Sequence, residues 1–457
     1  MAYTNFCCRS GGSNLNAGTR TGNTTEPGTT AAFTYAAGNS DGTSLFTAPA
    51  GSNPFTDGVA VGDWGSVYLN AATVTVFIGR VTAVTATTIT FSTTAKTGTF
   101  PALGTGTVTC KIGGAWAGPN GASGFPFSFL TNAATNTSAN PVRINVKSDA
   151  IYSVTTGITF SSAKVIIEGY TTSYGDEGLA TITSGSAIII FTFSAAGLVR
   201  CLKFISSVTT GSSANISIGT AGAILEKCVV YGAMGNGITI TAAAMVIGCE
   251  VLGCNKANGS GAGAISAGGT GTVIKNCIIY NNVGTNNCGI QVSAPTFISR
   301  CILVNNGLNG IRFGAFTTAF IEQCDIYNNK SHGMNFTSTG LAIIRNSQII
   351  KNGGWGINGV STANLIKTIN CAYGGGTMAN TSGKSTGGAM NEVSPIDHVS
   401  NFSPYIDAAA GNFNSFPNIT WGTAANDFLQ TSGGYTGTSG FFDIGASQHL
   451  PNKIMDD

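Results

Sequence analysis

Two stretches of this chain repeat one another: residues 297–313 read FISRCILVNNGLNGIRF, and residues 320–336 read FIEQCDIYNNKSHGMNF. Each has a cysteine in fifth place, an Asn pair in ninth and tenth, and a glycine in fourteenth followed by an apolar residue. The cysteine recurs at steps of 21 to 28 residues by subtraction, at Cys201, Cys228, Cys249, Cys277, Cys301, Cys324, Ser347 (a serine in its place) and Cys371. The glycine keeps step with it, which indicates a repeat architecture.

The repeat predicts a parallel β-helix. Apolar residues lie at positions −4, −3, 0 and +2 around each cysteine, without the 3.6-residue period of a helix, so each copy reads as short strands bent at a corner. A coil of 20–25 residues pairs with its neighbours at about 4.8 Å, and equivalent residues then stack. We expect an interior cysteine stack and a corner ladder of bonded amides, formed by Asn282, Asn306, Asn329 and Asn352. The glycines are predicted to supply corner backbone geometry that other residues resist.

Composition excludes several classes of protein. Charged residues make up 9% of the 457 residues and the formal net charge is +2, whereas ordinary soluble domains carry about 25% charged residues. Nucleic acid and anionic membranes require clustered Lys and Arg, so neither is an expected partner. No apolar run approaches the ~20 residues of a membrane span. The opening MAYTNFCCRSGG shows no secretory signal.

Most of the twelve cysteines, those of the repeat, are predicted to be free, buried thiols. Ser347 fills the repeated position without loss of pattern, which indicates a requirement for size and not for a bond. Whether Cys7, Cys8 and Cys254 are bridged stays open, since they lie off the stack and the Cys7–Cys8 pair could join two chains. No Cys or His spacing fits zinc, and neither a metal nor a cofactor is predicted.

Five regions follow along the chain. Residues 1–30 form an N-terminal segment, and 31–112 alternate apolar and polar residues, which predicts a small antiparallel barrel or sandwich. Residues 113–185 hold a connector and the first, irregular coils, and 186–373 hold the regular coils. Residues 374–457 are predicted to leave the helix at 374–402 and then cap its last coil, which would otherwise expose a sheet edge. The predicted fold class is all-β.

The opening SGGSNLNAGT (10–19) resembles the start of many right-handed parallel β-helix proteins of the pectate-lyase-like superfamily, although Asn14 replaces the usual Asp. PYIDAAAGNF (404–413) and FFDIGASQ (441–448) are similar to their endings. The resemblance implies a right-handed parallel β-helix in which residues 31–112 are an insertion. The superfamily includes pectate lyases, polygalacturonases, phage tailspike depolymerases and many non-catalytic members. The resemblance also implies a homotrimer, for which outward-facing Ile278 and Ile302 would supply an apolar strip.

Four acidic residues are candidates for catalysis: Glu322, Asp325, Asp176 and Glu177. Glycosidases need paired carboxylates about 5–9.5 Å apart, and lyases need acidic groups for calcium beside a base. Glu322 and Asp325 share a coil but straddle a bend, Glu322 is expected to pair with Arg345 at the surface, and Asp176-Glu177 lie in a Gly-flanked turn. His332 occupies a permissive repeat position and is interpreted as structural. No catalytic site is therefore predicted, and the binding residues stay unknown.

The favoured function is a non-catalytic structural or adhesive protein of a virion surface, as a phage tailspike, fibre or capsid decoration. Its expected partners are other virion proteins, and host cell-surface glycans stay open as a further partner. One alternative is a tailspike depolymerase that cleaves host polysaccharide as a lyase or glycoside hydrolase. Another is a β-helix protein of the bacterial cell surface or the extracellular space.

Overall fold

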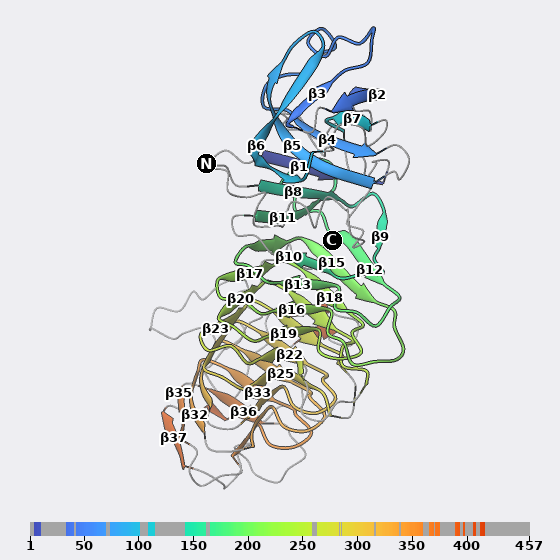
Figure 1. Ribbon diagram of the computed structural model, residues 1–457. Coiled ribbons are helices and arrows are strands. Elements are labelled where there is room, and N and C mark those ends of the chain that lie inside the picture. Colours follow the sequence, from blue (N-terminus) through green and yellow to red (C-terminus); the bar gives the residue numbers. More distant parts are fainter. Residues whose placement is uncertain are drawn as a thin grey trace. The chain divides into compact units, whose positions relative to one another are not determined.

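The computed structural model describes most of the chain between residues 4 and 374 and four short strands beyond it. The described residues are 4–10, 33–40, 43–69, 74–100, 108–114, 142–160, 165–257, 263–282, 284, 286–314, 317–337, 340–359, 365–369, 371–374, 389–393, 396–397, 405–407 and 412–415. They contain strands and turns and no α-helix. The chain divides into two units, Met1–Phe204 and Ile205–Asp457 (Figure 1).

The first unit begins and ends in parallel coils, with a closed antiparallel barrel between them. The barrel has the strand order β2-β3-β6-β5-β4-β7 and closes where β7 pairs with β2. Its strands are β2 Phe33–Ser40, β3 Leu45–Thr47, β4 Trp64–Leu69, β5 Val74–Val84, β6 Thr88–Gly98 and β7 Val108–Ile112. Phe46, Phe77, Phe91 and Phe100 fill it, and the predicted small β module is thus a barrel.

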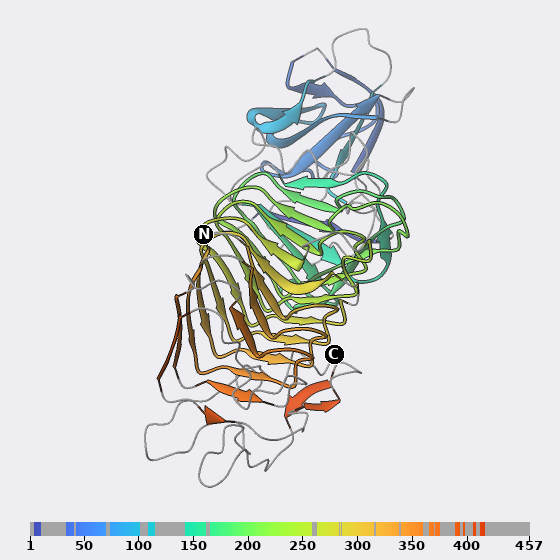
Figure 2. The same ribbon diagram turned by 90° about the horizontal axis from the view of Figure 1, so that it is seen from below.

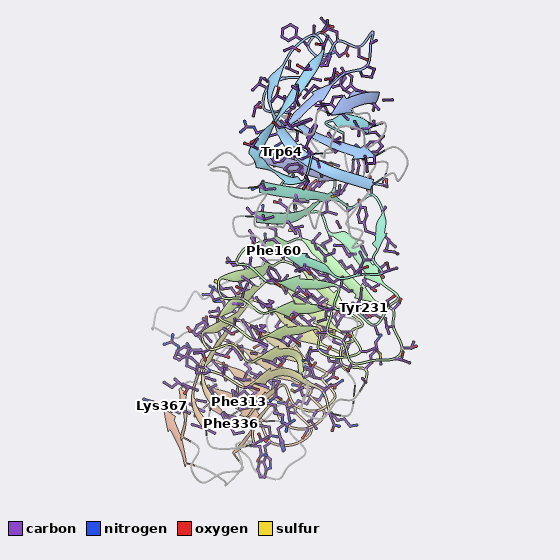
Figure 3. The ribbon with its side chains drawn as sticks, viewed as in Figure 1. Trp64, Phe160, Tyr231, Phe313, Phe336 and Lys367 are labelled. Atoms are coloured by element: carbon purple, nitrogen blue, oxygen red, sulfur yellow. The ribbon has the colours of Figure 1, made fainter. Side chains whose placement is uncertain are left out.

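The barrel is an insertion in the β-helix. Strand β1, Thr4–Cys8, pairs in parallel with β8, Val142–Lys147, which itself pairs with β11, Val165–Tyr170. Phe6 of β1 is fully buried and meets Trp64 of the barrel edge to face, with ring centroids 5.3 Å apart (Figure 3). Other strands of this unit are β9 Ile151–Ser153, β10 Ile158–Phe160, β12 Ala180–Ser184, β13 Phe191–Phe193 and β14 Leu198–Arg200, and β15, Leu202–Ser206, crosses its boundary. The contact between Phe6 and Trp64 therefore joins the first coil to the barrel.

The second unit consists of stacked coils that build three parallel sheets (Figure 2). The first sheet contains β17 Ala223–Glu226, β20 Ala244–Ile247, β23 Thr272–Lys275, β26 Thr296–Ser299, β29 Thr317–Glu322, β32 Gly340–Arg345, β35 Leu365–Ile369 and β37 Ala389–Val393. The second contains β16 Ile216–Ile218, β19 Ile238–Ile240, β22 Gly263–Ala267, β25 Cys288–Val292, β28 Ile311–Phe313, β31 Met334–Phe336 and β34 Ile357–Gly359. The third contains β18 Val229–Tyr231, β21 Glu250–Leu252, β24 Ile278–Tyr280, β27 Ile302–Val304, β30 Asp325–Tyr327, β33 Gln348–Ile350, β36 Ala372–Gly374 and β38 Ile396–Asp397.

The coils continue beyond their predicted end. Strand β37 pairs with β35, and β38 pairs with β36, so the prediction that residues 374–402 leave the helix is wrong for these two strands. Pairing satisfies backbone groups that would otherwise form an open sheet edge. A separate hairpin joins β39, Tyr405–Asp407, to β40, Asn412–Ser415. Three parts of the prediction lie outside the described residues: most of the cap, including 441–448, the remainder of 404–413, and Asn14 with most of its opening motif.

The interior cysteine stack is confirmed. Cys228, Cys249, Cys277, Cys301 and Cys324 are at most 1% exposed. All twelve cysteines of the chain are buried and none forms a disulfide, including Cys7, Cys8 and Cys254. Each stacked thiol from Cys249 onward donates to the carbonyl three residues before its predecessor, as Cys301 does to Ile274 O at 3.6 Å. Cys201 is an exception: its φ of 54° matches that of Lys227, so it occupies the corner before the cysteine position.

The amide ladder is also confirmed. Asn306 Nδ2 donates to Asn329 Oδ1 at 2.9 Å, and Asn329 Nδ2 donates to Asn352 Oδ1 at 3.0 Å. The second amide hydrogen of Asn329 bonds to Leu303 O at 3.1 Å, and its carbonyl accepts from Asn306 N at 3.1 Å. Cys254 occupies the ladder position one coil before Asn282 and donates its backbone N–H to Asn282 Oδ1 at 2.9 Å. The buried amides therefore satisfy one another along the stack.

The glycine prediction is wrong in its physical reason. The left-handed corners fall directly before the cysteine position and four residues after it, where φ is 49–54° at Lys227, Asn276, Arg300, Gln323, Asn346, Asn281, Asn305, Asn328 and Lys351. These residues tolerate the strain because their N–H groups pair with the next coil, as Arg300 N does with Glu322 O at 2.9 Å. Gly310 and Gly333 have no left-handed φ; a Cβ at either would lie 2.7 Å from the carbonyl oxygen of the equivalent glycine in the next coil.

Cys301→Ser should change the free energy of unfolding by less than about 1 kcal/mol, because a serine hydroxyl can make the bonds of this position. Ser347 shows how: its Oγ donates to Arg345 O at 2.9 Å and accepts from Cys324 N at 3.1 Å. Cys301→Leu should instead destabilise by about 1–3 kcal/mol through overpacking. Chemical denaturation measures both, and a serine variant as unstable as the leucine variant would contradict the size requirement.

Candidate functional site

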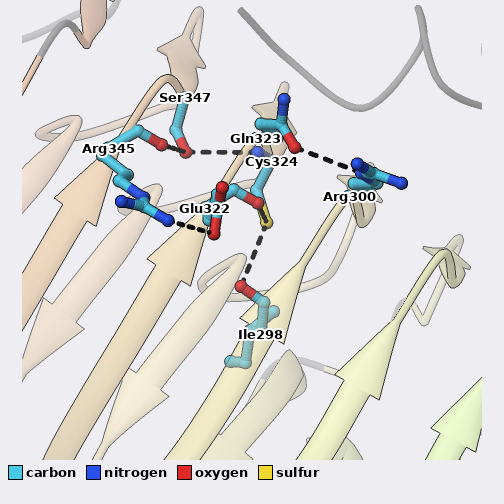
Figure 4. Close-up of polar contacts among 7 residues, drawn as sticks. All are labelled: Ile298, Arg300, Glu322, Gln323, Cys324, Arg345 and Ser347. Atoms are coloured by element: carbon cyan, nitrogen blue, oxygen red, sulfur yellow. Dashed lines mark hydrogen bonds and ion pairs between the residues drawn. The ribbon is translucent and has the colours of Figure 1, made fainter.

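The corner between the first and third sheets carries a group of polar contacts among side chains of neighbouring coils, shown in Figure 4. Arg345 Nη2 donates to Glu322 Oε2 at 2.9 Å across two neighbouring strands, and its guanidinium carbon lies 4.8 Å from the ring centroid of Phe320. Gln323, the residue after Glu322, accepts a hydrogen bond at its Oε1 from Arg300 Nε of the preceding coil at 3.1 Å. The predicted ion pair is present. Because Arg345 is 43% exposed and Glu322 21% exposed, the pair is partly solvated, and we expect its contribution to stability to be small.

Glu322 and Asp325 do not form a catalytic pair. Glu322 ends β29 in the first sheet, whereas Asp325 begins β30 in the third sheet, and the left-handed Gln323 turns the chain between them. Asp325 is only 1% exposed, so its carboxylate is closed to a substrate in solution. The two carboxylates therefore serve different faces of the coil, as the predicted bend implied.

Asp176 stabilises the turn that contains it. Its carboxylate accepts hydrogen bonds from the backbone N–H groups of Thr171, Thr172, Ser173 and Gly178 at 2.7–3.1 Å. Burial works against the charged form, but these four N–H groups outweigh it and hold the pKa of Asp176 well below its usual range. Neighbouring Glu177 has a left-handed φ of 62°. A carboxylate committed to four N–H groups is a poor general acid or base at neutral pH.

A buried carboxylate that the sequence reasoning missed lies in the first unit. Glu168 is fully buried on β11; its Oε2 accepts from Arg200 Nη2 at 2.9 Å and lies 3.7 Å from Arg143 Nε. The register Asn145↔Glu168↔Arg200 brings these side chains onto adjacent strands. Sequence spacing alone offers no signal for it, because these early coils lack the cysteine repeat. Two guanidinium groups beside one inaccessible carboxylate make a structural ion cluster.

His332 takes the place of an asparagine at the corner before the second sheet. Asn309 Oδ1 accepts the backbone N–H of His332 at 3.1 Å, and one coil later His332 Nδ1 accepts the N–H of Trp355 at 3.0 Å. The neutral ring, with Nδ1 unprotonated, thus performs the role of the Asn309 carbonyl. This position has a structural use that any acceptor of suitable reach can fill.

Burial lowers the pKa of His332 from its ordinary value of 6.5, because the imidazolium ion loses hydration. The folded chain therefore binds fewer protons than the unfolded chain, so the contribution of neutral His332 to stability is lost as pH falls through 6.5 toward the lowered value. We expect His332→Asn to match the parent at pH 8 and to exceed it in stability near pH 5. Denaturant midpoints at both pH values measure this, and an equal loss at both would contradict it.

No group of three or more His, Cys, Asp and Glu side chains in the described part of the chain could hold a metal ion. The described residues likewise contain no helix of the length and apolarity that crossing a bilayer requires.

Comparison with known proteins defines the class. Residues 187–340 match the model of a family described as a right handed beta helix region. With its three parallel sheets, this chain is a right-handed parallel β-helix protein. A search of curated proteins finds no match.

Three similar solved structures are a pectate lyase, an alginate epimerase and a phage tailspike. The pectate lyase Pel9A is 15% identical, covers 72% of this chain and 94% of its own, and has a TM-score of 0.46. The periplasmic alginate epimerase AlgG is 11% identical over 57% of this chain and 80% of its own, with a TM-score of 0.30. The tailspike protein gp49 from Pseudomonas phage LKA1 is 12% identical over 80% and 59%, with a TM-score of 0.25. Likeness at this level carries no argument about activity.

Proposed function

We propose that this protein is a non-catalytic structural or adhesive component of a virion surface. The observation that carries the proposal is that the four acidic candidates occupy separate structural positions. Glu322 pairs with Arg345, Asp325 is buried, Asp176 caps its own turn, and Glu177 forms a left-handed corner of that turn. Catalysis requires ionisable groups that converge on one accessible place, and these four do not converge.

The outer face of the second sheet supports an adhesive role. One residue of each strand points outward there, and neighbouring strands place these residues in register. They are half-buried and carry hydroxyl, amide or guanidinium groups: Ser217, Thr239, Ser266, Gln291, Arg312, Asn335 and Asn358. Such groups exchange hydrogen bonds with the hydroxyls of a glycan. A row of weak contacts on a rigid scaffold gains avidity when several copies are displayed on one particle.

The barrel supports attachment to other virion proteins. It enters the chain between β1 and β8, so the first coil carries a separate folded module that can bind another protein. Immunogold labelling and mass spectrometry of purified particles test this placement. The protein should be found on the particle surface; recovery only from bacterial envelopes would favour the bacterial-surface alternative.

The catalytic alternative is tested by turnover. Purified protein incubated with host surface polysaccharide should release neither reducing ends nor unsaturated products. Glu322→Gln, Asp176→Asn and the matched control Glu226→Gln, which alters a carboxylate outside the candidate set, should behave like the parent. Sustained turnover that Glu322→Gln or Asp176→Asn abolishes, and that Glu226→Gln leaves intact, would establish a depolymerase in place of the structural protein.

A further inference from the structure

A straight apolar column runs along the outer face of the first sheet in the second unit. The strand register stacks one residue from each of six successive strands, in the order Ile224, Met245, Val273, Phe297, Phe320 and Ile343. The residues next to them along the chain point inward and are at most 2% exposed: Ala223, Leu225, Ala244, Val246 and Ile274. Met245 is 37% exposed and the other five are partly exposed. The column is therefore an outer surface.

This column replaces the apolar strip that the sequence predicted. Ile278 and Ile302 are 5% and 0% exposed, so they cannot form a free surface, and that prediction is wrong. All three residues of β24 and of β27 are buried, because both faces of these strands are covered. Among the described residues, the outer face of the first sheet thus presents a continuous row of large apolar side chains.

A second column lies two residues further along the same strands. It reads Glu226, Ile247, Lys275, Ser299, Glu322 and Arg345 in the same coil order. Since alternate residues of a strand share a face, both columns face outward together. This second column begins with the acidic Glu226 and ends with the basic Arg345, so its two ends carry opposite charges.

The two columns of one copy fit those of a second copy whose coils run in the opposite direction. In an antiparallel pair, with the two-fold axis parallel to the strands between β23 and β26, the first coil faces the sixth, the second the fifth and the third the fourth. Ile224 then meets Ile343, Met245 meets Phe320 and Val273 meets Phe297, so each large ring faces a smaller side chain.

The charges fit the same arrangement. Glu226 of one copy faces Arg345 of the other, twice by symmetry, and Lys275 faces Ser299. Glu322 faces Ile247 and keeps its ion pair with Arg345 of its own chain. A parallel pairing puts each coil opposite itself. Phe320 then meets Phe320 and Val273 meets Val273, which leaves an uneven contact, and Glu226 and Arg345 lie at opposite ends and never meet.

We infer that the outer face of the first sheet, from β17 to β32, binds a second copy of this chain in an antiparallel pair. A partner whose own coils repeat at the same spacing of about 4.8 Å can match all six positions at once, and a second copy is such a partner. Six coils span only about 24 Å, less than a standard interface, so the pair is a weak one and the fraction of dimer depends on concentration.

Sedimentation analysis over a wide concentration range should show a monomer–dimer equilibrium. Met245→Lys should raise the dissociation constant at least about tenfold, because it places a charge against Phe320 of the second copy. The fold should be unaffected, since Lys367 already occupies this column one coil beyond Ile343. Ser266→Lys, a matched change on the second sheet, should leave the equilibrium unaltered.

Cross-linking through one introduced cysteine per chain determines the relative orientation of the two copies, since the twelve native cysteines are buried. Chains with Ile247→Cys mixed with chains with Glu322→Cys should give a cross-linked dimer with a short bismaleimide, whereas either variant alone should give none. Cross-linking of each variant with itself would establish a parallel assembly, including the three-fold form, and would overturn the inference. A monomer at every concentration would overturn it as well, and so would an equilibrium that Met245→Lys leaves unchanged.

Discussion

Asn329→Asp should destabilise the chain by on the order of 4 kcal/mol at neutral pH, although the two side chains have nearly the same shape. The Asn329 amide donates to Leu303 O at 3.1 Å and to Asn352 Oδ1 at 3.0 Å, and a carboxylate can donate to neither. Two buried acceptors would each lose one hydrogen bond, although Asn352 Oδ1 keeps the backbone N–H of Asn329 at 3.0 Å. A charge would also enter a site that is 1% exposed. Urea denaturation of parent and variant measures the difference.

Asn328→Asp is the matched control, because Asn328 is the exposed neighbour of Asn329 and aspartate tolerates its left-handed φ of 51°. It should change stability by no more than about 0.5 kcal/mol. Burial raises the pKa of the new carboxyl in Asn329→Asp above its unfolded value, so its deficit is full above that raised pKa and shrinks as pH falls through it. Equal destabilisation by both variants would show that the ladder does not hold the coils together.

Gly333→Ala should destabilise by about 1–3 kcal/mol or more, because one methyl group has no space at this corner. Its Cβ would lie 2.4 Å from Ile349 Cγ2, 2.7 Å from Gly356 O and 2.8 Å from Asn352 Nδ2. Relief would require the next coil to move away, which stretches the hydrogen bond from Gly333 N to Trp355 O. The amide ladder passes through the same corner, so the two defects should be coupled, and the double variant with Asn352→Ala should be less than additive.

Gly314→Ala provides the control for this substitution. The nearest atoms to its added Cβ lie 3.5 Å away, which is ordinary contact, and its φ is not left-handed. It should leave stability unchanged or raise it slightly, because alanine restricts the unfolded chain. If Gly333→Ala were as stable as Gly314→Ala, the close approach of coils at Gly333 would not explain the repeated glycine.

The repeat was readable in the sequence because a β-helix places equivalent residues in equivalent surroundings at every coil. The spacing of Cys277, Cys301 and Cys324 therefore set the register, the interior stack and the amide ladder together, and the structure confirms all three. The ion pair of Glu322 and Arg345 followed from the same register. Cys201 was misplaced by one position, since its coil has Asn215 where the next coil has the landmark glycine Gly237, and so offers no second reference point for the alignment.

What the sequence by itself determined is the pairing of each strand with its neighbours, a relation between residues one repeat apart. Only the tertiary structure decided which faces are covered, because burial depends on what lies beyond the repeat. Ile278 and Ile302 are closed for that reason, whereas Met245 and Phe320, which are no more apolar, form an open column. The reason for the glycines was also tertiary: the space at Gly333 is set by atoms of the next coil and not by its own backbone angles.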